Sequence, residues 1–237
     1  MTAIVLQARI DSTRLPGKAL LNIEDKPILF HVMDALNHVK ADERILACSE
    51  DSFSAFEPIA MECGFKIFAG PKEDVLERYC QVIRKYSIDR VIRATGDNPF
   101  VFADSAEVIN NEAVSLNADY AGYLNLPYGA GVESVAASAL LLAAKDANAF
   151  EREHVCPYLY NNPAKFKVHR PEAPAHWRFP DIRLTIDTQE DFERAKDLYK
   201  VLKDTPQKYN GVKIINAYKE FHKNKNPTET QKYGEIV

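Results

Sequence analysis

Residues 4–95 alternate between short apolar segments and amphipathic ones. The apolar segments, which predict strands, are Ile4–Ala8, Arg44–Ser49, Lys66–Ala69 and Arg90–Thr95. The amphipathic segments between them, which predict helices, are Pro27–Val39, Ser52–Cys63 and Glu73–Tyr86. Regular strand–helix alternation with short Gly- and Pro-containing connections is typical of an α/β fold with a doubly wound, mostly parallel sheet.

The second half of the chain is less regular and predicts a small irregular insert in that fold. Its expected helices are Asp104–Leu116, Ser138–Ala147, Glu151–Tyr160 and Gln189–Leu202. Its expected strands are Asp119–Tyr123, Phe166–Arg170 and Arg183–Ile186, and the loop 126–131 leads into Val132–Ala136. Because we find no linker, we expect a single domain over residues 1–222 and a polar tail over 223–237.

The first apolar segment runs directly into a basic loop. Arg9, Arg14 and Lys18 lie within ten residues of one another, beside the hydroxyl side chain of Ser12 and the turn Pro16-Gly17. Fixed cations and exposed backbone N–H groups at the end of a strand are what a polyphosphate requires. A solvated surface loop whose arginines pair with nearby acids is the alternative interpretation.

Two aspartates follow other predicted strands at their carboxyl ends. Asp97 follows Gly96 after the strand Arg90–Thr95, and Asp187 follows the expected strand Arg183–Ile186. Each has an ordinary interpretation, as a turn residue or near a helix N-cap. Ligands bind at the carboxyl ends of strands in such sheets, so both aspartates can face the crevice of the basic loop. Two carboxylates beside substrate phosphates are the usual protein ligands of Mg²⁺.

Composition limits the possible partners and compartments. The formal net charge of −4 argues against a general binder of nucleic acid or of membrane surfaces. We find no membrane span, no signal peptide and no CxxC pair among the four cysteines, so we expect reduced cysteines and a cytoplasmic protein. The absence of GxGxxG after the first strand disfavours a dinucleotide-binding oxidoreductase.

Several ordered motifs over most of the chain together resemble one enzyme family. The motifs are Gln7–Lys18, Arg93–Pro99, Gly131–Glu133, Glu151–Val155 and Arg183–Thr188. The chain resembles the cytidylyltransferases of the spore coat polysaccharide biosynthesis (SpsF-like) group, which are related to the acylneuraminate and 3-deoxy-manno-octulosonate cytidylyltransferases. The resemblance implies a Rossmann-like fold of the nucleotide-diphospho-sugar transferase type. It also implies transfer of CMP from CTP to a sugar or sugar acid, with release of pyrophosphate.

The resemblance assigns roles to individual residues of the nucleotide site. The residues expected to bind the nucleotide are Leu6, Ala8, Arg9, Ser12, Arg14, Lys18 and Asp97. Of these, Arg14, Lys18 and Asp97 are expected to be catalytic, by stabilising charge on the departing pyrophosphate or by aligning the attack on the α-phosphate. Asp97 and Asp187 are expected to bind Mg²⁺.

The acceptor site and the oligomeric state follow from the same resemblance. Tyr128, Glu133 and His154 are the expected acceptor-binding residues. Glu133 can equally be a solvated strand residue, and His154 can be structural. A homodimer is expected. The segment 151–154 can form a polar wall of the same cleft, but Arg152 and Glu153 are interpreted as exposed residues at a helix start.

The loop departs from the family pattern at Asp11, where glycine is commonest. The acid either points away from the phosphates or holds a cation; otherwise it would weaken nucleotide binding. Two alternative functions stay open at this point. One is a nucleotidyltransferase that uses another NTP with a sugar phosphate, and the other is a non-catalytic nucleotide-binding protein of the same fold.

Overall fold

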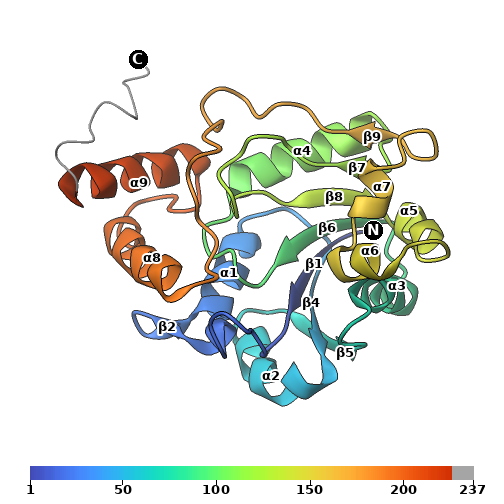
Figure 1. The fold of residues 1–237 in the computed structure, drawn as a ribbon, viewed down its shortest axis with the longest axis horizontal. Helices are drawn as coiled ribbons and strands as arrows, with labels where there is room; N and C mark the ends of the chain where they lie inside the picture. The colour runs from blue at the N-terminus through green and yellow to red at the C-terminus, as the bar shows by residue number, and fades with distance from the viewer. Residues whose placement is uncertain (226–237) are drawn as a thin grey trace.

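A single seven-stranded sheet runs through the molecule in the order β5-β4-β1-β6-β8-β7-β9 (Figure 1). The structure, a computed structural model, describes residues 1–225. The strands are β1 (Thr2–Ala8), β4 (Glu43–Ser49), β5 (Lys66–Gly70), β6 (Arg90–Thr95), β7 (Tyr120–Ala121), β8 (Glu133–Ala136) and β9 (Val168–His169). Strands β5, β4, β1 and β6 are parallel, whereas β8 is antiparallel to both β6 and β7. The mostly parallel sheet predicted from the sequence is confirmed.

Strand β1 lies between β4 and β6, so its backbone is paired on both sides. Its side chains alternate between two separate hydrophobic cores: Ile4 and Leu6 face one, and Ala3 and Val5 face the other. All four are fully buried. A strand that is buried on both faces requires helices on both faces, which is the doubly wound arrangement.

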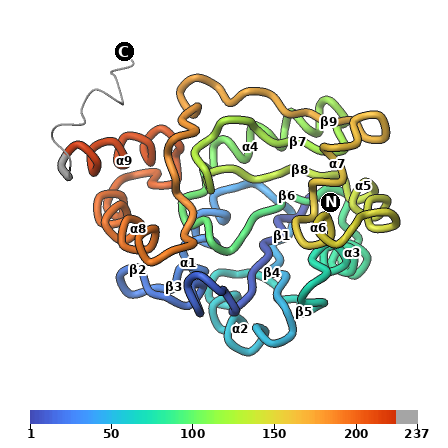
Figure 2. The backbone as a smooth tube through the Cα atoms, viewed as in Figure 1, coloured from blue at the N-terminus to red at the C-terminus, as the bar shows by residue number. Residues whose placement is uncertain are grey.

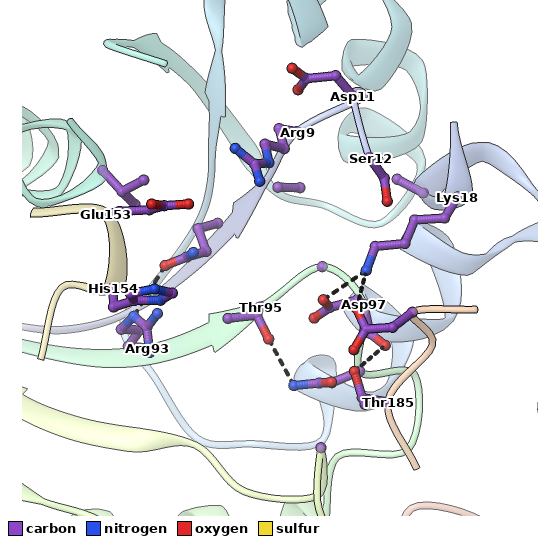
Figure 3. A pocket seen from close by; sticks show the side chains of 18 of the residues that line it. Arg9, Asp11, Ser12, Lys18, Arg93, Thr95, Asp97, Glu153, His154 and Thr185 are labelled. Carbon is purple, nitrogen blue, oxygen red and sulfur yellow. Dashed lines mark hydrogen bonds and ion pairs between the residues drawn. The ribbon is translucent and has the colours of Figure 1, made fainter. Parts of the chain in front are cut away.

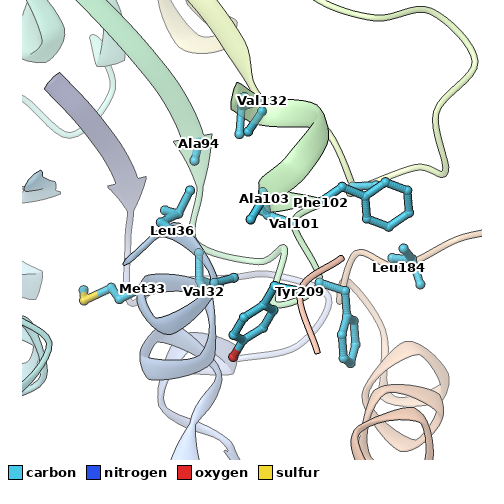
Figure 4. Packing of buried hydrophobic residues seen from close by; sticks show 14 of the residues in the cluster. Val32, Met33, Leu36, Ala94, Val101, Phe102, Ala103, Val132, Leu184 and Tyr209 are labelled. Carbon is cyan, nitrogen blue, oxygen red and sulfur yellow. The ribbon is translucent and has the colours of Figure 1, made fainter. Parts of the chain in front are cut away.

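The helices divide between the two cores. The helices are α1 (Ile28–Asn37), α2 (Phe53–Glu62), α3 (Val75–Tyr86), α4 (Ala103–Ser115), α5 (Ala137–Ala143), α6 (Ala149–His154), α7 (Pro157–Tyr160), α8 (Gln189–Leu202) and α9 (Gly211–Lys225). Helices α1, α2, α4, α8 and α9 contribute to the core of Ile4, and α3, α5 and α7 contribute to the core of Val5. Figure 4 shows Val32 and Leu36 of α1 gathered with residues 101–103 in the first of these cores.

Two of the elements expected in the second half differ from prediction. The expected helix Glu151–Tyr160 is interrupted, because Val155 takes a φ of 73° and separates α6 from α7. The expected strand Arg183–Ile186 is an extended segment with one isolated bridge, between Arg183 and Tyr128. Its backbone bonds to loops: Leu184 N donates to Tyr128 O and Ile186 N donates to Asp97 O. This segment therefore joins loops at the end of the sheet.

Two further elements were not predicted from the sequence: the hairpin β2 (Asn22–Ile23)–β3 (Lys26–Pro27) and helix α9. The hairpin and helix α8 are distant in sequence but lie side by side (Figure 2). Helix α9 runs through Lys225, past the expected start of the polar tail, and the rest of that tail lies outside the described residues. No helix within residues 1–225 is both long and apolar enough to cross a bilayer.

Candidate active site

A cavity of about 670 Å³ opens at the carboxyl ends of β1 and β6 (Figure 3). Its lining residues come from both halves of the chain: Gln7, Ala8, Arg9, Asp11, Ser12, Thr13, Arg14, Lys18, Ala19, Val75, Arg78, Arg93, Thr95, Gly96, Asp97, Asn98, Tyr128, Gly129, Glu133, Phe150, Glu153, His154, Pro157, Tyr160, Thr185 and Asp187. Every site residue predicted from the sequence lines this cavity except Leu6.

Lys18 joins the two predicted aspartates. Its Nζ donates to Asp97 Oδ2 at 3.0 Å and to Asp187 Oδ1 at 2.9 Å. A third bond, of 2.8 Å, goes to the carbonyl oxygen of Ile186. Only 15% of the Lys18 side chain is exposed, so these bonds form in a partly desolvated place. The two carboxylates thus face each other across one ammonium group.

The backbone holds these aspartates together independently of their side chains. Ile186 N donates to Asp97 O at 2.9 Å, which fixes Asp187 beside the loop that follows β6. Although burial disfavours the charged form, Lys18 and Arg14 hold the pKa of Asp187 below its usual range. Asp187 therefore stays ionised at neutral pH.

The same pair of carboxylates suits a divalent cation. No group of three His, Cys, Asp or Glu side chains within the described residues could hold a metal ion. Asp97 and Asp187 together offer hard oxygen ligands from two carboxylates. This donor set fits a metal that takes its remaining ligands from substrate phosphates and water.

The basic loop surrounds a second hollow of about 250 Å³, next to the main cavity. Arg9 and Ser12 line both hollows, and Arg14 Nη2 lies 3.1 Å from Asp187 Oδ1. Leu6 is fully buried in the core and does not line the cavity, which corrects that prediction. Because β1 is paired on both sides, the backbone of Leu6 is already engaged in the sheet. Gln7, one residue later, lines the cavity.

Asp11 pairs with a cation, which is one of the two alternatives left open by the sequence. Its Oδ2 lies 2.7 Å from Lys72 Nζ, and Lys72 belongs to the loop between β5 and α3. The Asp11 carboxylate therefore does not face the cavity uncompensated.

Glu133 belongs to a half-buried polar cluster and is not a solvated strand residue. Arg93 forms an ion pair with Glu133, and Tyr120 Oη donates to Glu133 Oε1 at 2.7 Å. Arg93 Nε also donates to Gln7 Oε1 at 3.1 Å. Burial and the neighbouring Glu133 carboxylate raise the pKa of Tyr120, so its hydroxyl stays protonated and donates.

The other acceptor candidates lie on the more exposed side of the cavity. Tyr128 is exposed and stacks with the Arg183 guanidinium at 5.0 Å. His154 is also exposed, and its ring centroid lies 4.3 Å from that of Phe150. Glu153 is exposed, as predicted, and it also lines the cavity beside His154 (Figure 3).

Arg78 is the most informative residue that the sequence analysis missed. Its side chain is 2% exposed and lines the cavity. It donates to the carbonyls of Pro71, Lys72 and Ala47 and pairs with no carboxylate of the described residues. An arginine on the apolar face of a predicted helix, three residues after Val75, was the available signal.

Gly129 is expected to tolerate no side chain. Its φ is +92°, and an added Cβ would lie 2.6 Å from Thr185 N and 2.9 Å from Asn98 Oδ1. We expect Gly129→Ala to lower the free energy of unfolding by at least about 2 kcal/mol in urea denaturation. Gly64→Ala is the control, because Gly64 has a φ of +74° but open space around it. Equal losses in the two variants would contradict a steric role for Gly129.

Comparison with known proteins places this geometry in one family. The family model described as "Cytidylyltransferase" matches residues 3–220. The spore coat polysaccharide biosynthesis protein SpsF of Bacillus subtilis (strain 168) is 37% identical over 211 residues, which cover 85% of this chain and 88% of SpsF. A 3-deoxy-manno-octulosonate cytidylyltransferase of Aeromonas hydrophila is 28% identical over 151 residues, which cover 51% of this chain and 60% of that enzyme.

Solved structures agree with the fold. A cytidylyltransferase from Leptospira borgpetersenii has a TM-score of 0.81 at 27% identity, covering 100% of this chain and 99% of that one. A CMP:2-keto-3-deoxy-manno-octonic acid synthetase complexed with CTP has a TM-score of 0.66 at 18% identity, covering 84% and 98%. Rv0371c of Mycobacterium tuberculosis, solved with manganese, has a TM-score of 0.57 at 16% identity, covering 82% and 96%. From its motifs, its fold and the family match over residues 3–220, this chain belongs to the cytidylyltransferase family.

Proposed function

We propose that this protein transfers CMP from CTP to a sugar, sugar acid or similar acceptor and releases pyrophosphate, in surface polysaccharide or glycan biosynthesis. The observation that carries the proposal is the contact of Lys18 Nζ with both Asp97 and Asp187 at the carboxyl edge of the sheet. A plain nucleotide binder has less need of two ionised carboxylates at this position.

In this proposal the basic loop binds the triphosphate. Arg9 pairs with no carboxylate of the described residues, so its charge is available to an anion. Arg14 and Lys18 lie beside the aspartates and would stabilise the negative charge that develops on the departing pyrophosphate. Ser12 and Ala8, which line the same cavity, would contact the ribose and base.

Asp97 and Asp187 would hold Mg²⁺ together with oxygens of the substrate phosphates. When bound, such an ion neutralises charge on the α-phosphate and orients it. Lys18 contacts both carboxylates and so keeps them within reach of each other without a metal.

The acceptor would lie toward Tyr128, Glu133 and His154, which line the same cavity. An acceptor oxygen attacks the α-phosphorus and forms the new P–O bond, and the bond from that phosphorus to the bridging oxygen breaks. Pyrophosphate leaves with that bonding pair, and a hydroxyl acceptor loses its proton to solvent. The protein's part is to hold the two reactants in line.

Release of pyrophosphate tests the proposal directly. Each of the four NTPs is incubated with Mg²⁺, with Mn²⁺ or with EDTA, against sugar acids, sugar phosphates and small phosphonates. We expect release only with CTP, a divalent metal and a particular acceptor class. Release with another NTP would reassign the base, and CTP binding by calorimetry without release across the panel would support a non-catalytic binder. A homodimer and a cytoplasmic location are further proposals, and light scattering tests the first.

A further inference from the structure

The basic loop contains an acid as well as cations, and the acid needs an explanation. Asp11 lines both the main cavity and the smaller hollow inside the loop. An uncompensated carboxylate at this position would repel a triphosphate. Lys72 Nζ lies 2.7 Å from Asp11 Oδ2 and provides the compensating charge.

Lys72 also connects the basic loop to the end of β4. Its Nζ donates to Asp51 Oδ2 at 2.8 Å. The other oxygen of Asp51 accepts from Ser49 Oγ at 2.6 Å and from Ser52 Oγ at 3.1 Å. Ser52 Oγ in turn accepts a bond of 2.9 Å from the backbone N–H of Ile10. The start of the basic loop is therefore held by two contacts, the ion pair of Asp11 with Lys72 and the hydrogen bond from Ile10 N to Ser52 Oγ. Asp51 connects the two, because it contacts both Lys72 and Ser52.

The backbone of Lys72 is itself held in place. Arg78 Nη2 donates to Lys72 O at 2.9 Å and to Pro71 O at 2.6 Å, and the Arg78 side chain is buried. A lysine on a fixed backbone needs to order only its own side chain to form both ion pairs. Lys72 thus differs from a lysine on a freely moving surface loop.

We propose that Lys72 is a positioning residue for the nucleotide, which neutralises Asp11 and holds the basic loop against the loop between β5 and α3. The proposal rests on the proposed function, because it assumes that phosphates bind at this loop. Lys72 does not line the cavity, so it acts through Asp11 rather than by touching the substrate. The competing interpretation is a surface ion pair without functional effect, since Lys72 is 39% exposed and Asp11 is 47% exposed.

A double-mutant cycle separates these interpretations. The variants are Lys72→Met, Lys72→Arg, Asp11→Asn and the double variant Lys72→Met/Asp11→Asn. We expect Lys72→Met to raise both the KM and the Kd for CTP by about five- to tenfold, because a negative charge is left unpaired near the phosphates. Its kcat should stay within about twofold of the wild type, since no group at the reacting atoms changes. The variant Lys72→Arg, which keeps the positive charge, and the double variant, which removes both charges, should each have a KM within about twofold of the wild type.

The matched control is Lys66→Met, which removes a lysine that pairs with Glu43 away from the cavity. Raising NaCl to about 0.5 M should reduce the increase in KM caused by Lys72→Met, because salt screens partly exposed charges.

The inference would be overturned if Lys72→Met left the KM and the Kd for CTP unchanged. It would also be overturned if Lys72→Met and the double variant weakened CTP binding equally. If the wild type binds CTP but releases no pyrophosphate, only the proposed function fails. The Kd values for CTP of the wild type, the two single variants of the cycle and the double variant still test the role of Lys72. Absence of CTP binding by the wild type would overturn both.

Discussion

Replacing Asp97 with asparagine is expected to lower kcat for pyrophosphate release by about 100- to 1,000-fold. The change keeps the size of the side chain and an oxygen that can accept from Lys18, so the fold should be preserved. It removes one of the two negative charges expected to hold the metal at the α-phosphate. The Kd for CTP, measured by calorimetry, should change by no more than about fivefold, because in the proposed site Arg9 and Arg14 would still bind the phosphates.

Asp89→Asn is the matched control for this experiment. Asp89 stands immediately before β6, whereas Asp97 lies beyond its carboxyl end, and Asp89 pairs with the N-terminal amine. Its replacement removes the same charge at the other end of the same strand, so kcat should remain unchanged. If Asp97→Asn retained full activity, the assignment of a catalytic metal to Asp97 would have to be abandoned.

Replacing Arg93 with methionine is expected to lower the free energy of unfolding by about 3 kcal/mol. Arg93 is 13% exposed, and Glu133, its partner, is 21% exposed. Without Arg93, the half-buried Glu133 carboxylate would keep the hydrogen bond from the Tyr120 hydroxyl but lose its charged partner. Urea denaturation at pH 7, followed by circular dichroism, measures the loss.

The double variant Arg93→Met/Glu133→Gln tests the cause of that loss. A neutral glutamine can still accept the hydrogen bond from Tyr120, so we expect at least half of the lost stability to return. Recovery would identify the uncompensated charge, rather than lost packing of the arginine stem, as the source of the effect. A double variant as unstable as Arg93→Met would point to packing instead.

The parallel part of the fold could be predicted because its strands are long and apolar on both faces. β1, β4 and β6 gain their stability from burial against helices with strong periodicity, so local pattern and tertiary structure agree. β7 and β9 contain two residues each and exist only through their neighbours in the sheet. The segment 183–186 is apolar like a strand, but its hydrogen bonds go to the loops at 97 and 128, which no local pattern encodes.

The site also has residues that the sequence predicts and residues whose place depends on tertiary packing. Lys18, Asp97 and Asp187 were predicted to meet because side chains that follow parallel strands gather at one edge of the sheet, and the structure brings these three together. Arg78 was not predicted as a site residue, and Glu153 was interpreted as an exposed one, because the orientation of their helices toward the cavity depends on packing between elements. Leu6 was assigned to the site although a strand paired on both sides has no free backbone there.

Separate stretches of the chain line the cavity. Residues 7–19 and 75–98 supply the basic loop and Asp97, residues 128–160 supply Tyr128, Glu133 and His154, and Thr185 and Asp187 complete the lining. If Tyr128, Glu133 and His154 bind the acceptor, sequence change within residues 128–160 would alter which acceptor is used and would leave the basic loop, Asp97 and Asp187 unchanged. Under the proposed function, recombining residues 128–160 between relatives offers a direct route to enzymes with new acceptors, and it explains how one scaffold can diversify without losing its reaction.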